Sequence, residues 1–171
     1  MRKFIDRALQ KLPKLDAEQI RALLFDLANE NDRLESVLDS LTEGVLVSDE
    51  EHNLILVNKP AERRIPLAGT EIYERRIWDA IADEEIAAFL RESLENQESV
   101  FDREFALEHS GLTRTLALSV LPVVKEGHIQ GNLLLLKDIT ERKSKEARLR
   151  RAESLASLST LAAGVAHEIK N

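Results

Sequence analysis

Hydrophobic and polar positions follow a helical period near both ends of the chain and a strand period between them. In residues 17–41, seven positions spaced alternately by four and three residues hold six aliphatic side chains and one Asn. Asp16 precedes this stretch and Gln19 follows three residues later, which is typical of a capping box at a helix N-terminus. The spacing predicts a helix with a coiled-coil seam of about three heptads.

The seam of this first helix predicts a parallel dimer. Its a and d positions are Ile20, Leu24, Leu27, Asn31, Leu34, Leu38 and Leu41. An Asn at an a position can pair across a dimer axis, and it disfavours registers in which its amide lacks a partner. We therefore expect Leu24, Asn31 and Leu38 in a homodimer seam. The alternative is an amphipathic helix packed on its own domain, with Asn31 in solvent.

The middle of the chain alternates as strands do. The expected strands are 44–48, 53–57, 100–108, 113–124 and 130–138, and the expected helices are 59–64 and 77–97. Asp49 to His52 separate the first two strands as in a hairpin, while Gly111 and Gly127 mark the later turns. The residues expected on the buried face of the sheet are Leu46, Leu56, Leu116, Leu118, Leu133 and Leu135. The order is two strands, short helices, then three strands.

Residues 141–171 contain no Pro and one Gly, and they predict a continuous helix that leaves the sheet at Thr140. Its apolar seam is Ala152, Leu155, Leu158, Ala162, Val165 and Ile169. We expect Leu155, Leu158 and Val165 in a dimer seam whose irregular step near Leu155 alters the local supercoil. His167 stands about 200° from its seam neighbours and should be accessible.

The end of this helix has the residue types of a nucleophilic site. Neutral imidazole is a competent nucleophile near neutral pH, and an adjacent carboxylate can hold the ring and accept its proton. Glu168 adjoins His167, and Asn171 lies on the same face as the imidazole, four residues on. An exposed His followed by Glu is ordinarily a solvated surface residue, and that alternative stays open on these residues alone.

Two resemblances connect these patterns. The segment His167-Glu168-Ile169-Lys170-Asn171 resembles the H-box of sensor histidine kinases, H-E-x-x-N on a dimeric helix. The strand order, ending in Asp138-Ile139-Thr140, resembles a PAS domain, a five-stranded antiparallel sheet with helices on one face. The resemblance implies an α+β fold flanked by coiled-coil helices. Its parts would be a dimerisation segment at 1–41, a PAS sensor at 42–140, and at 141–171 a signalling helix that begins the dimerisation and histidine phosphotransfer domain.

The histidine kinase resemblance implies residue roles and partners. His167 would accept phosphate from ATP, Glu168 would be the general base, and Asn171 would position water for dephosphorylation of a response regulator. Asp138, Ile139 and Thr140 would transmit the signal. The chain has no glycine-rich phosphate cradle, so ATP and Mg would belong to an ATP-binding domain of the full-length kinase. Since the phosphotransfer helix is half complete, we expect the protein to continue beyond Asn171, and the chain alone to be inactive.

Composition limits what the sensor binds. The chain has no Cys, which excludes a covalent flavin adduct or a thioester-linked chromophore. Residues 83–97 contain no His as an axial ligand for haem, while His52, His109 and His128 fall in predicted turns, where solvent exposure is expected. No metal site, haem or covalent flavin is therefore expected. Trp78, Arg63 and Tyr73 could surround an anionic ligand, although a filled core with surface arginines is the alternative.

Net charge and hydropathy limit the kinds of partner and the location that we expect for the protein. The net charge of −7 disfavours nucleic acid. No apolar stretch approaches the roughly 18 residues of a membrane span, so we expect a cytoplasmic protein. Two other functions stay open: a noncatalytic dimeric PAS adaptor, and a ligand-binding PAS module that controls dimerisation.

Overall fold

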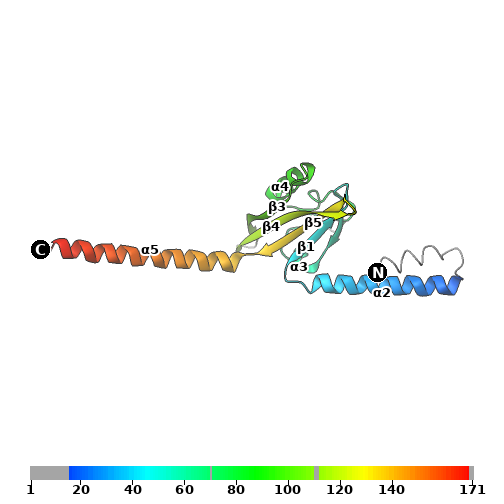
Figure 1. The fold of residues 1–171 in the computed structure, drawn as a ribbon, viewed down its shortest axis with the longest axis horizontal. Coiled ribbons are helices and arrows are strands. Elements are labelled where there is room, and N and C mark those ends of the chain that lie inside the picture. Colours follow the sequence, from blue (N-terminus) through cyan, green and yellow to red (C-terminus); the bar gives the residue numbers. More distant parts are fainter. Residues whose placement is uncertain (1–15, 70, 110–111, 170–171) are drawn as a thin grey trace. The chain divides into compact units, whose positions relative to one another are not determined.

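The computed structural model describes the backbone of residues 16–69, 71–109 and 112–169 (Figure 1). Side chains within these ranges are described except at 109, 112 and 157–169. The chain divides after Thr42, with α2 (Ala17–Asp39) in the first unit and the sheet in the second. Asp16 Oδ1 accepts hydrogen bonds from the N–H groups of Glu18 at 3.0 Å and Gln19 at 2.8 Å. Gln19 Oε1 accepts one from the Asp16 N–H at 3.2 Å, which confirms the predicted capping box.

The second unit is built on one antiparallel sheet. Its strands are β1 (Gly44–Ser48), β2 (Leu54–Val57), β3 (Val100–His109), β4 (Leu112–Lys125) and β5 (His128–Asp138). Their order is β2-β1-β5-β4-β3, so the first and last strands of the sequence pair in the middle, with Leu46 opposite Leu134 (Figure 1). The five expected strands and their antiparallel arrangement are confirmed.

The helices of the second unit differ from the expectation in one place. They are α3 (Lys59–Glu62), α4 (Glu84–Glu95) and α5 (Thr140–Ile169). The prediction that a helix starts at Ile77 is wrong, because Ile81 forms an antiparallel bridge with Leu67 and is therefore not helical. The helix begins only after Asp83, whose Oδ1 accepts a hydrogen bond from the N–H three residues on at 2.9 Å. The start of α5 at Thr140 is as predicted, and no helix in the described part of the chain is apolar enough over 18 residues to cross a membrane.

The hydrophobic core lies between one face of the sheet and helices α3 and α4. Its fully buried large side chains are Leu46, Leu54, Ile65, Ile77, Ile86, Leu90, Leu94, Leu116, Leu118, Val120, Leu134 and Leu136. Close packing of α3 on β1 requires a glycine, because a Cβ on Gly44 would lie 2.9 Å from the Ala61 Cα. Aliphatic side chains therefore fill the space between these helices and the sheet.

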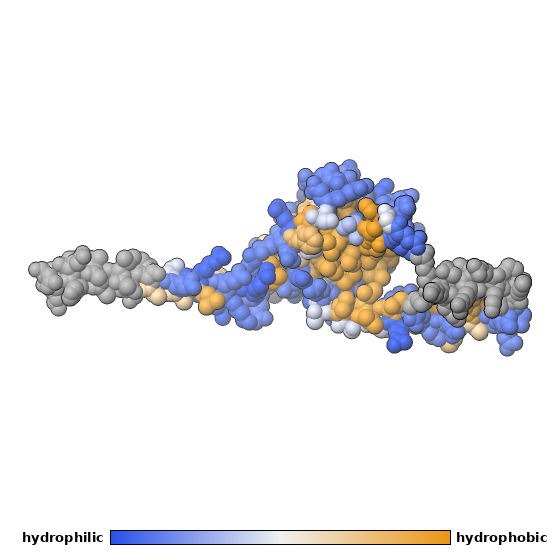
Figure 2. Space-filling view, viewed as in Figure 1, coloured by the Kyte–Doolittle hydropathy of each residue, from blue (hydrophilic) through white to orange (hydrophobic). Residues whose placement is uncertain are grey.

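The opposite face of the sheet also carries aliphatic residues. For this reason the sequence prediction assigned the wrong residues of β2 and β5 to the core. Leu56, Leu133 and Leu135 were expected in the core but are half-buried, and their neighbours Leu54, Leu134 and Leu136 are buried instead. Residues 133–136 are four leucines, so alternation could not choose a face. Figure 2 shows a hydrophobic area over the strands and a hydrophilic surface over α4.

Candidate functional site

The chain passes from β5 into α5 through the triplet predicted to transmit the signal, Asp138-Ile139-Thr140. The backbone N–H and the hydroxyl of Thr140 donate to Asp138 Oδ1 at 3.0 and 2.6 Å. The Thr140 hydroxyl oxygen also accepts a hydrogen bond from the Thr115 N–H at 3.0 Å, while the Ile139 N–H donates to the Thr115 carbonyl at 2.9 Å. With Ile139 buried, the end of β5 and the first residue of α5 are both fixed to β4.

The Asp138 carboxyl is the charged centre of this junction. Its partial burial raises the pKa, but the hydrogen bonds from Thr140 and the positive charges of Arg64 and Arg114 outweigh that effect and hold the pKa below its usual range. The carboxylate is therefore ionised at neutral pH and accepts both Thr140 hydrogen bonds. Because the folded-state pKa is depressed, its contribution to stability is complete above the unfolded pKa of about 3.9 and is lost as pH falls through the folded value.

Ion pairs connect the first turn of α5 to β3. Lys143 Nζ lies 2.6 Å from Glu104 Oε2, and Arg142 Nη2 lies 4.0 Å from Glu104 Oε1. These side chains are 38% to 60% exposed, so water and salt screen the attraction. The junction therefore combines hydrogen bonds at the sheet with weak ion pairs at its edge.

The predicted phosphoacceptor residues lie on or beyond the last turn of α5. The backbone of His167 and Glu168 is helical, and their side chains lie outside the described residues, as Asn171 does entirely. The helix runs without interruption from Thr140 to this turn. The roles of the three residues stay predictions.

Two of the predicted seam residues, Leu24 and Leu155, are largely uncovered in the single chain. Leu24 is 59% exposed and Leu155 is 67% exposed, while Leu38 is half-buried. Asn31 Nδ2 donates to Glu35 Oε1 at 3.3 Å along the surface of α2. The side chains of Leu158 and Val165 are outside the described part of α5, so their place in a seam stays a prediction.

The three residues predicted to bind an anionic ligand have different surroundings, and their binding role stays a prediction. Trp78 packs against the His52 ring, with centroids 5.7 Å apart, and the Arg76 guanidinium lies 5.7 Å from its ring centroid. Arg63 lines a separate pocket of about 220 Å³, while Tyr73 is 51% exposed. His52 was expected to be solvent-exposed and is half-buried, because its ring packs on Trp78.

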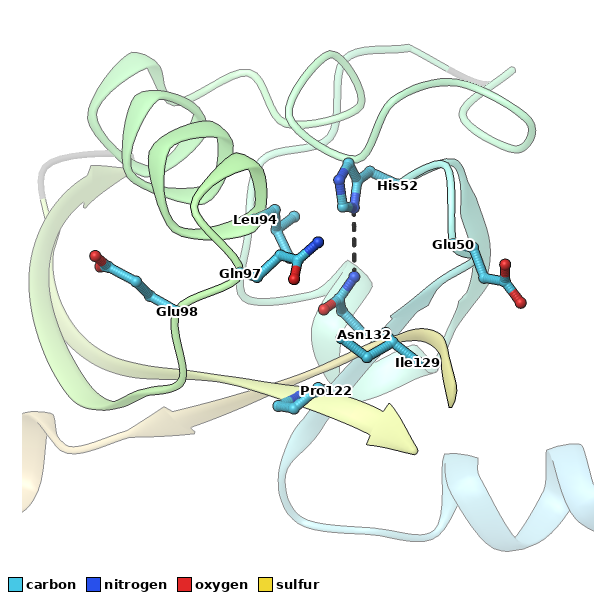
Figure 3. A pocket seen from close by; sticks show the side chains of 8 residues that line it. All are labelled: Glu50, His52, Leu94, Gln97, Glu98, Pro122, Ile129 and Asn132. Carbon is cyan, nitrogen blue, oxygen red and sulfur yellow. Dashed lines mark hydrogen bonds between the residues drawn. The ribbon is translucent and has the colours of Figure 1, made fainter. Parts of the chain in front are cut away.

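A second pocket, of about 240 Å³, contains a polar pair that sequence reasoning did not single out (Figure 3). Its lining residues are Glu50, His52, Leu94, Gln97, Glu98, Pro122, Ile129 and Asn132. Asn132 is 9% exposed, and its Nδ2 lies 3.4 Å from His52 Nδ1 and 3.3 Å from Ser48 Oγ. The amide Nδ2 can donate a hydrogen bond to the imidazole at Nδ1.

A glycine brings the two strands of this pocket together. Gly131 has φ +141°, and a Cβ there would overlap the Ser48 carbonyl oxygen. Only glycine therefore lets β5 approach the end of β1 so closely. The polar residue Asn132, set among aliphatic residues of β5, was the sequence signal for this position. Among the described residues, no group of three acidic, His or Cys side chains is placed to hold a metal ion.

Sequence reasoning also missed Asn58, a buried polar residue that joins β1 to α3. Its Oδ1 accepts from the N–H groups of Val45 at 2.8 Å and Ala61 at 3.1 Å. Its Nδ2 donates to the Glu43 carbonyl at 3.1 Å. An Asn that follows an apolar strand and precedes Lys-Pro is a helix N-cap signal, which could have identified it.

Comparison with known proteins identifies the family to which this architecture belongs. The family described as PAS fold matches residues 38–144. Sporulation kinase E of Bacillus subtilis (strain 168) is 33% identical over 141 residues, covering 81% of this chain and 19% of that protein. The sensory histidine kinase/phosphatase NtrB of Proteus hauseri is 29% identical over 136 residues, covering 79% of this chain and 38% of that protein. The chain thus spans well under half the length of these curated relatives.

A solved histidine kinase structure is also similar to this chain. The histidine kinase ThkA, in complex with the response regulator protein TrrA, is similar with a TM-score of 0.51 and 28% identity. The similarity covers 80% of this chain and 40% of that one. The family match includes all five strands, α3, α4 and the first residues of α5. The chain therefore belongs to the PAS fold family, and its PAS domain is homologous to part of known sensory histidine kinases.

Proposed function

We propose that this chain is the sensory and phosphoacceptor part of a two-component histidine kinase. The observation that carries the proposal is the unbroken α5, which starts at the Asp138–Thr140 junction and extends through His167. A change in the sheet can thereby reach the helix that holds the phosphoacceptor. The kinase relatives and the similarity to a kinase–regulator complex support it.

In this proposal the imidazole of His167 attacks the γ-phosphorus of ATP. The nitrogen–phosphorus bond forms as the bond to the ADP oxygen breaks, and Glu168 accepts the imidazole proton. The phosphoryl group then moves to an aspartate of a response regulator, and Asn171 positions water when the regulator is dephosphorylated. The ATP-binding domain of the longer protein supplies ATP and Mg.

The proposed assembly is a cytoplasmic homodimer. Leu24, Asn31 and Leu38 of α2 would form one seam, and the second would include Leu155. The uncovered aliphatic residues of α2 support this arrangement, since none of its residues is buried in the single chain. A dimer would bring two phosphoacceptor helices together.

Phosphorylation in trans tests the proposal. The chain is incubated with radiolabelled ATP, Mg and a separately purified ATP-binding domain from a histidine kinase. We expect an acid-labile label on the chain, lost in His167→Gln and slowed about 100-fold in Glu168→Gln, which removes the general base. His128→Gln is the matched control, because His128 is an exposed residue at the start of β5, and it should keep the label.

Two results of the phosphorylation assay would contradict the proposal. A domain that phosphorylates its own helix and leaves this chain unlabelled would contradict the phosphoacceptor role, and a noncatalytic PAS adaptor would then account for the fold. A label that persists in His167→Gln would place the phosphate on another residue.

A further inference from the structure

The pocket between the β1–β2 turn, the end of α4 and the β4–β5 hairpin has the chemistry of a cation site (Figure 3). We propose that it binds a small organic cation, an ammonium group on a short aliphatic body. The binding step stands without the kinase proposal. Only its consequence for phosphorylation of His167 rests on the proposed function.

The first observation is a hydrogen-bond acceptor at the pocket wall. Asn132 uses its Nδ2 for Ser48 and His52, and its Oδ1 accepts no hydrogen bond from any residue that the structure describes. Figure 3 shows this oxygen turned away from His52 and toward the side of the pocket where Gln97 lies. The side chain is 9% exposed, so a donor that enters the pocket meets an acceptor already oriented by two neighbours. An ammonium N–H satisfies it.

The second observation is the negative charge of the residues that line the pocket. Glu50 and Glu98 line the pocket, and none of its lining residues is Lys or Arg. Figure 3 shows both carboxylates pointing away from the centre, so they act on a ligand through their field. The Gln130 amide that bonds Glu50 Oε1 at 3.3 Å is neutral and leaves the charge in place. Because the lining residues carry two carboxylates and no Lys or Arg, the field at the pocket favours a cation over an anion.

The third observation is the size and the apolar part of the wall. The pocket has a volume of about 240 Å³. It is below the roughly 300–1,000 Å³ of sites for drug-sized molecules. Leu94, Pro122 and Ile129 offer contact to a short hydrocarbon body. The absence of a three-ligand metal group among the described residues favours an organic cation over a metal ion.

The position of the pocket gives binding a route to the output helix. Asn132 lies on β5, which ends at Asp138 and is hydrogen-bonded to β1 and β4. A ligand that holds Asn132 acts on the strand that leads into α5. If binding occurs and labelling of His167 is unchanged, the site is kept and its link to phosphorylation is rejected.

An NMR titration of the ¹⁵N-labelled chain with three probes of similar shape tests the site. The probes are 3-methylbutan-1-amine, 3-methylbutan-1-ol and 4-methylpentanoate, at pH 7 and low salt. We expect the amine to shift the Asn132 side-chain amide signals and the backbone signals of His52 and Gln97, with a Kd of about 1 mM to 10 mM. The alcohol should bind at least five-fold more weakly, and the carboxylate should leave the signals in place. Equal binding of amine and alcohol, tighter binding of the carboxylate, or shifts elsewhere only would overturn the proposal.

Variants test separately how the two carboxylate charges and the Asn132 hydrogen bond contribute to amine binding. The double change Glu50→Gln and Glu98→Gln should weaken amine binding about two- to five-fold and leave the alcohol unaffected. Glu85→Gln is the matched control, an exposed Glu at the start of α4 that should change neither. Asn132→Asp keeps the shape of the side chain, and Ser48 and His52 can donate to it, so amine binding should tighten about ten-fold. An amine Kd unchanged in both the double variant and Asn132→Asp would reject the site.

Discussion

Helices α4 and α5 are attached to the same sheet in different ways. On α4, Ile86 and Leu90 are 0% exposed and Leu94 is 1% exposed. On α5, none of the described side chains is buried, and the helix is held by Ile139 before its first turn and by polar contacts. Moving α4 exposes three core side chains, at about 1.5–3 kcal/mol each, whereas moving α5 breaks hydrogen bonds worth about 1 kcal/mol each. The cheaper displacement is that of the helix with the predicted phosphoacceptor.

Leu90→Ala should produce the largest effect. It removes a fully buried side chain where α4 packs on the sheet, and we expect the free energy of unfolding to fall by about 2–5 kcal/mol. Urea unfolding followed by circular dichroism measures the loss. The matched control is Leu149→Ala on α5, where the side chain is 64% exposed and the cost should stay within about 0.5 kcal/mol. Similar losses in both variants would remove the contrast between the two helices.

Asp138→Ala should have an intermediate effect, because it deletes the acceptor of two Thr140 hydrogen bonds. We expect a loss of about 1–2 kcal/mol near pH 7. Asp138→Asn keeps an acceptor oxygen but removes the charge that Arg64 and Arg114 stabilise, so it should cost less.

The pH dependence identifies the charge at Asp138. Its folded-state pKa is lowered, so the stability difference between the native chain and Asp138→Asn should be constant above about pH 5. It should shrink as pH falls below about 4, where the unfolded chain takes up a proton at this carboxyl, until the pH has fallen through the lowered pKa of the folded chain. Urea unfolding at a series of pH values tests this, and a difference that grows on acidification would mean that burial, not its partners, controls the carboxyl.

What the sequence could predict depends on how local each signal is. The capping box at Asp16 and the start of α5 at Thr140 were predicted correctly because each rests on residues within one turn. The buried face of β5 was not, because its leucine run lacks alternation and the choice of face depends on the strands beside it. The His52–Asn132 pair joins residues 80 apart, and only the pairing of β1 with β5 brings them together.

Glu104→Gln should have the smallest effect and sharpens the comparison within the junction itself. The carboxylate lies 2.6 Å from Lys143 Nζ, but both side chains are well exposed, so we expect a cost of about 0.2–1 kcal/mol at low salt and almost none at 1 M salt. The control is Glu141→Gln, which removes the Lys145 ion pair within α5 and leaves the contact with β3 intact. If Glu104→Gln cost more than Asp138→Ala and resisted salt, α5 would be held chiefly at β3, and the signal would have to pass through the edge of the sheet. A small, screened effect instead leaves Asp138 and Thr140 as the connection that a change in β5 must act on.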